Sequence, residues 1–75
     1  MKATVNTKDM LDFLKEQWTY THELIEDFGQ KDERAQMHIG WCIGMKEMCE
    51  ALLCVPVNLQ RDGKLTLGID GEVEV

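Results

Sequence analysis

The chain has little of what marks a secreted, membrane-bound or nucleic-acid-binding protein. Its 75 residues include one proline, three cysteines and only eight Lys and Arg residues against 14 Asp and Glu, which gives a formal net charge of −6. This shortage of positive charge argues against direct contact with nucleic-acid phosphates. No apolar run is long enough to span a membrane, and the N-terminus lacks the apolar segment of a signal peptide.

The cysteines are not arranged as a disulfide framework. Their number is odd. On a helix, Cys42 and Cys49 would be separated by about 10 Å along the axis, and Cys49 and Cys54 by about 7.5 Å. Both separations exceed the distance that a disulfide spans. We therefore expect three reduced thiols in a cytoplasmic protein.

Catalytic motifs are also absent. The sequence contains no glycine-rich phosphate loop, no nucleophile elbow and no metalloprotease signature. A hydrolase would need an oxyanion hole and a binding cleft, for which so short a chain has little room. We therefore expect no catalytic residues, no enzymatic activity and no cofactor.

The first half of the chain predicts an amphipathic helix over residues 8–28. Its apolar residues recur in alternating steps of three and four, and acidic residues dominate the other side. Asn6 or Thr7 is expected to cap its start, because either side-chain oxygen can accept a free backbone N–H. Gly29 is expected to end it in the left-handed conformation.

A second helix is predicted over residues 32–54, with Asp32 as its cap. The short connection predicts that the two helices are antiparallel neighbours. This second helix is apolar around most of its circumference, and such a helix should be buried on most sides. A chain of 75 residues cannot easily cover it, so we expect other copies or a partner to do so.

The pattern changes after Pro56, which ends the helix. Apolar residues alternate on both sides of Asp62-Gly63, a dipeptide typical of hairpin turns, and predict a β-hairpin over residues 55–69. Residues 70–75 form a tail in which the alternation returns and could add a third strand. The prediction is one small domain, residues 1–75, of mainly α class: an antiparallel two-helix hairpin followed by a small C-terminal β-hairpin.

Copies of the chain are predicted to assemble through their second helices into a helical-bundle homo-oligomer. Gly40 and Gly44 are four residues apart, as small residues are where two helices approach closely. The alternative is that these glycines accommodate the bulk of Trp18 or Phe13 within one chain. The predicted interface residues are Gly40, Trp41, Gly44, Met45, Met48 and Leu52.

Polar residues interrupt the apolar stripe of the second helix at Arg34 and His38. A carboxylate of the first helix, Glu26 or Asp27, is expected to compensate the charge of Arg34. The alternative is an anionic ligand between subunits, such as a nucleotide, with its phosphate on the arginine and its base stacked on a tryptophan. The candidate ligand-binding residues are Arg34, His38, Trp41, Arg61 and Lys64.

Three functions of different class stay open at this stage. The favoured one is a non-enzymatic adaptor or inhibitor that binds a protein partner, a type common among small accessory proteins of bacteria and their phages. Its acidic first helix could also imitate a phosphate backbone and occupy a nucleic-acid-binding protein. The alternatives are a ligand-binding oligomer and a metal-binding module using His38 and Cys42, although the close ligand pairs of zinc sites are missing.

Overall fold

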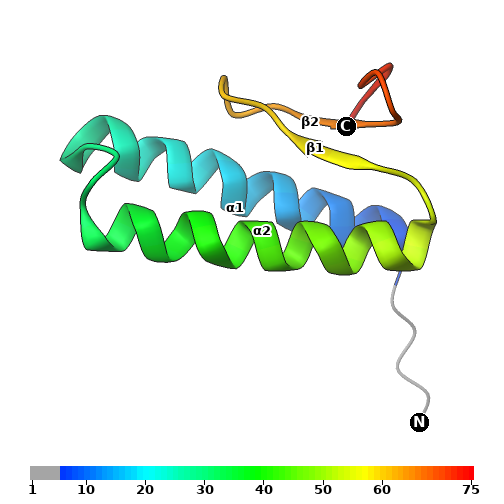
Figure 1. Ribbon diagram of the computed structural model, residues 1–75, viewed down its shortest axis with the longest axis horizontal. Helices are drawn as coiled ribbons and strands as arrows, with labels where there is room; N and C mark the ends of the chain where they lie inside the picture. The colour runs from blue at the N-terminus through cyan, green and yellow to red at the C-terminus, as the bar shows by residue number, and fades with distance from the viewer. Residues whose placement is uncertain (1–5) are drawn as a thin grey trace, which may run out of the picture.

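The computed structural model describes residues 6–75, which form two helices followed by three short strands (Figure 1). Helix α1 spans Thr7–Phe28 and helix α2 spans Glu33–Leu53. The two helices run antiparallel beside each other, because only residues 29–32 connect them. The mainly helical fold and the helix pair predicted from the sequence are confirmed.

Side-chain caps fix the start of both helices. The backbone N–H of Lys8 donates to the side-chain oxygen of Asn6 at 2.9 Å, and that of Arg34 donates to Asp32 at 2.9 Å. Each cap satisfies a backbone donor that has no partner within the helix. The structure thus selects Asn6 over Thr7 and confirms Asp32.

Both helices end at a residue with positive φ. Gly29 has φ 91° and ψ 156°, an extended conformation open mainly to glycine, and not the left-handed helical one expected. Cys54 closes α2 with φ 57° and ψ 30°, and its backbone N–H donates to the carbonyl of Glu50. The left-handed conformation costs a residue with a Cβ roughly 1–2 kcal/mol. The end of α2 is therefore strained.

Three antiparallel strands follow in the order β1-β2-β3. Strand β1 (Val57–Leu59) and strand β2 (Leu65–Leu67) form the predicted hairpin, with Gly63 at φ 87° in its turn. Strand β3 (Val73–Glu74) pairs with β2. It lies in residues 70–75, which were predicted to be a tail. A two-stranded hairpin is marginal alone, so this third strand helps to hold the small sheet together.

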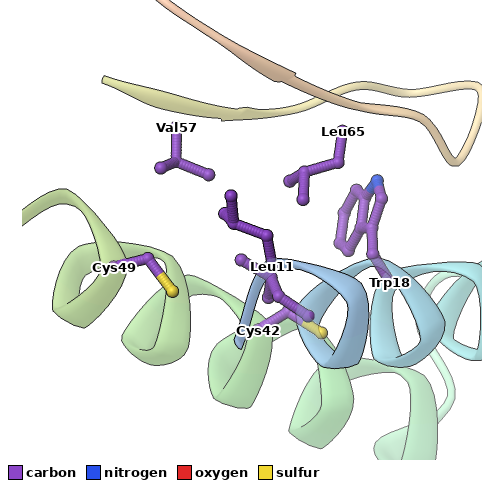
Figure 2. Close-up of a cluster of buried hydrophobic side chains, with 7 residues drawn as sticks. Leu11, Trp18, Cys42, Cys49, Val57 and Leu65 are labelled. Carbon is purple, nitrogen blue, oxygen red and sulfur yellow. The ribbon is translucent and has the colours of Figure 1, made fainter. Parts of the chain in front are cut away.

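The core lies between the sheet and the helix pair. Val57 and Leu65 point from the strands toward Leu11, Cys42 and Trp18 of the helices (Figure 2). Val57, Leu65 and Cys42 are fully buried. The apolar side chains that alternate along β1 and β2 thus point to one face of the sheet and cover one side of the helix pair.

Polar contacts fix the sheet on that side. The indole N–H of Trp18 donates to the carbonyl of Gln60 at 2.7 Å. The Glu50 carboxylate accepts the backbone N–H of Val57 at 3.0 Å and the ammonium of Lys46 at 3.0 Å. These two hydrogen bonds hold the pKa of Glu50 below its ordinary value. Helix α1 is therefore tied to the hairpin turn, and the end of α2 is tied to β1.

Residues 6–75 cover only part of the surface of helix α2. Its buried residues are Ala35, Cys42 and Cys49, all at the contact with α1 or the sheet. Large apolar side chains elsewhere on the helix are exposed: Met37, Trp41, Ile43, Met48 and Leu52. The apolar excess seen in the sequence is therefore exposed surface among the described residues. Its burial by other copies stays a prediction.

Candidate functional site

The two helices present a row of apolar and aromatic side chains on the side away from the sheet. Residues two apart on a helix point about 200° apart. Phe13 therefore faces away from Lys15, which contacts the C-terminal carbonyl of Val75, and Met48 faces away from Glu50. We name this surface the open face. It comprises Met10, Phe13, Tyr20, Met37, His38, Trp41, Met45, Met48 and Leu52.

A groove between α1 and α2 forms one end of the open face. Its volume is about 370 Å³, and its walls are Met10, Phe13, Met45, Met48, Cys49 and Leu52. Met48 is 64% exposed and Leu52 is 66% exposed. Every one of these side chains is apolar, and such continuous exposed apolar surfaces mark interaction sites.

Aromatic contacts extend the open face from the groove toward the turn between the helices. The Phe13 and Trp41 rings are perpendicular with centroids 6.3 Å apart. Trp41 meets His38 edge to face at 5.9 Å, and His38 meets Tyr20 in the same way at 4.9 Å. Edge-to-face contacts of this kind are favourable. They hold half-exposed rings in place, so that a partner would pay less side-chain entropy to bind them.

Carboxylates border the open face along α1. They recur every seven residues, and each lies one helical turn from Phe13 or Tyr20. All are exposed, and within residues 6–75 none of them forms a salt bridge. We name these residues the acidic rim: Asp9, Glu16 and Glu23. The open face is therefore apolar in the middle and negative along its α1 edge.

The predicted interface residues fall into two groups. Trp41, Met45, Met48 and Leu52 lie on the open face, with Met45 partly buried. Gly40 and Gly44 are exposed on α2, where an added Cβ would meet nothing within 4 Å apart from the helix itself and chain neighbours. The alternative that they accommodate Trp18 or Phe13 is therefore wrong. A seam between copies at these glycines stays a prediction.

Arg34 is compensated locally. Its guanidinium pairs with Asp32 at 3.1 Å and lies 3.6 Å over the centre of the Phe28 ring. The expectation of a partner at Glu26 or Asp27 is wrong, because the capping carboxylate already lies two residues away at the first turn. The side-chain hydrogen bond from Arg34 lowers the pKa of Asp32.

The candidate ligand-binding residues are not gathered in one place. His38 and Trp41 are neighbours on the open face. Arg61 instead lines a pocket of about 480 Å³ that Trp18 and His22 also line, beside the hairpin turn. Lys64 lies in the hairpin, 3.8 Å from Glu74. The two hairpin cations are therefore on the sheet side and do not join the open face.

The cysteines are free thiols, with Cys42 and Cys49 buried and Cys54 exposed. Burial raises the pKa of Cys42, against the opposite effect of its contact with Thr21 at 3.4 Å, and burial also raises the pKa of Cys49. Cys42 and His38, the pair considered for a metal, thus have separate partners. Among the described residues, no group of three or more His, Cys, Asp or Glu side chains is placed to hold an ion.

The contribution of α1 to the open face is the part that sequence reasoning missed. Met10, Phe13 and Tyr20 lie to one side of the heptad stripe of this helix. The signal was the apolar stripe of this helix, which is wider than its contact with one neighbouring helix requires.

In the part of the chain that the structure describes, no helix combines the length and apolar composition needed to cross a membrane.

No protein-family model, curated protein or solved structure matches this chain. The open face is a feature of the described residues that their own packing does not explain.

Proposed function

We propose that the protein is a non-enzymatic interaction protein, an adaptor or inhibitor that works by binding a protein partner through the open face. The observation that carries the proposal is the exposure of large apolar side chains in one row, among them Phe13, Trp41 and Met48. A partner that buries such a side chain completely gains about 1.5–3 kcal/mol for each. Several together supply the centre of a stable interface.

The composition of the groove favours a protein over a small molecule. A small-molecule site needs a few polar groups that orient the ligand. The walls of the groove are three methionines, a phenylalanine, a cysteine and a leucine. Methionine side chains adapt to the shape of an apolar partner and are frequent on protein-binding surfaces. A homo-oligomer formed through α2 would use the same residues, so one experiment tests both occupants.

Site-specific photo-crosslinking in cells tests this proposal. A photoreactive phenylalanine analogue replaces Met48 on the open face, and a matched control replaces Ile69, which is 85% exposed and lies between β2 and β3. We expect position 48 to give an adduct with a different protein and position 69 to give none. An adduct of twice the mass of the chain would assign the open face to a second copy. Equal adducts at both positions, or none at position 48, would contradict the proposal.

A further inference from the structure

The charge around the groove carries a more specific inference, which rests on the proposed function. We propose that the occupant of the groove is an amphipathic helix of a partner protein with Lys or Arg along one flank. Its apolar side would enter the groove between α1 and α2, and its basic flank would lie against the acidic rim. The groove and the rim are separate observations that point to the same kind of partner.

The helical backbone on both sides of the groove explains why the occupant is a helix. An extended peptide binds by adding backbone hydrogen bonds to the edge of a sheet. The groove walls are side chains from the first turns of α1 and the last turns of α2, and a helix presents no strand edge to pair with. A helix satisfies its own backbone and brings only side chains to the contact. Apolar residues spaced three and four apart on such a helix suit an apolar groove between two helices.

The acidic rim explains the charge of the occupant. Asp9, Glu16 and Glu23 extend over 14 residues of α1, which corresponds to about 21 Å. A partner helix of about four turns has the same length. Cations on its flank would meet carboxylates that have no salt bridge within residues 6–75. Opposite charges across an interface speed association and fix its register.

The described helices of a second copy offer no free row of cations to this rim. Its own open face carries the same acidic rim. The cations of the described helices are engaged elsewhere: Lys8 with Asp12, Lys15 with the carbonyl of Val75, Arg34 with Asp32, and Lys46 with Glu50. A membrane surface is disfavoured on the same ground, because anionic headgroups would face the rim. A basic helix is the occupant that the charges select.

Two peptides of about 14 residues test the inference with the whole protein. Both have Leu at the same amphipathic positions, and the remaining positions are all Lys in one and all Glu in the other. A third peptide with the Leu and Lys residues in scrambled order controls for unspecific attraction. The readout is the ¹³C-methyl signals of Met10, Met45 and Met48, which line the groove. Only the amphipathic Lys peptide should shift these signals at low concentration.

Variants assign the contact to the groove and the rim. Met48→Glu should weaken binding of the Lys peptide by about tenfold or more, because it places a charge in the apolar contact. The matched control Ile69→Glu should leave the affinity unchanged. Glu16→Lys and Glu23→Lys should each weaken binding about three- to fivefold, as exposed charge pairs do. Glu47→Lys, on the side of α2 away from the groove, controls for the change in net charge.

The outcomes separate this inference from the proposed function. Equal binding of the Lys and Glu peptides at the groove would overturn the basic partner and leave a protein-binding face. The basic partner would also be overturned if the rim reversals and Glu47→Lys weakened binding equally. Methyl shifts that depend on protein concentration without peptide would overturn it in favour of a second copy. No binding of either peptide would also overturn it, and the crosslinks from position 48 would then decide the proposed function alone.

Discussion

Truncating the same side chain at two places distinguishes the core from the open face. Leu65 is fully buried between the sheet and the helices, whereas Leu52 is 66% exposed at the groove. Leu65→Ala should lower the free energy of unfolding by about 2–5 kcal/mol, which includes the cavity that it leaves. Leu52→Ala removes only the buried third of a side chain, so it should cost about 0.5–1 kcal/mol. The total free energy of unfolding of a chain of this size is roughly 4–11 kcal/mol.

Urea unfolding followed by tryptophan fluorescence measures both values. Trp18 reports on the contact between α1 and the hairpin turn, where its indole N–H donates to Gln60. The measurement is made at micromolar protein, where the slope with urea should be the same for both variants. A cost below about 1 kcal/mol for Leu65→Ala would refute the core between sheet and helices. A cost for Leu52→Ala equal to that for Leu65→Ala would show that the open face is buried in the folded unit.

Three further predictions concern the C-terminal end and the outer side of α2. Hydrogen bonds to the charged carboxylate lower the pKa of Glu50 from its ordinary value of 4.5. Glu50 therefore stabilises the fold fully above pH 4.5, and this contribution is lost as the pH falls through the lowered pKa. Urea midpoints at pH 7 and pH 3 should therefore differ less for Glu50→Gln than for the wild type, and an equal difference would contradict this role. Cys54→Gly should raise the free energy of unfolding by about 1 kcal/mol, because glycine is not strained at φ 57°; a lower urea midpoint would count against it. Gly44→Ala should stabilise the chain by about 1 kcal/mol in the same assay, since an added Cβ meets only open space, whereas a loss would indicate another backbone at that position.

Local signals in the sequence were sufficient for the backbone of the fold. The steps of three and four residues predicted α1, with Asn6 as one of two candidate caps, and Asp32 marked the start of α2. Asp62-Gly63 marked the hairpin turn, with its glycine at positive φ. Each of these depends on residues close together in the chain, where propensity and hydrogen bonding act directly. The third strand was harder to predict, because two residues pair with β2 only through contacts between strands.

Side-chain partners were harder to predict, because they depend on which way each helix is rotated. From the sequence, Arg34 was predicted to pair with a carboxylate of α1. In the structure it pairs with Asp32, the cap of its own helix. Arg61 and Trp41 were also predicted to share one candidate ligand site, whereas Arg61 lies on the sheet side of the helix pair. The apolar excess of α2 was evident from composition. Which of its sides stays uncovered became clear only when the position of the sheet was known.

The uncovered state of the open face is the claim on which both proposals depend, and methionine methyl signals test it directly. The protein carries ¹³C-methyl methionine and is exposed to a soluble paramagnetic probe, without any partner. The structure predicts strong broadening of Met48 and Met37, which are 64% and 72% exposed, at every protein concentration. Protection of Met48 from the probe would contradict the account, because the open face would then be covered in the protein by itself.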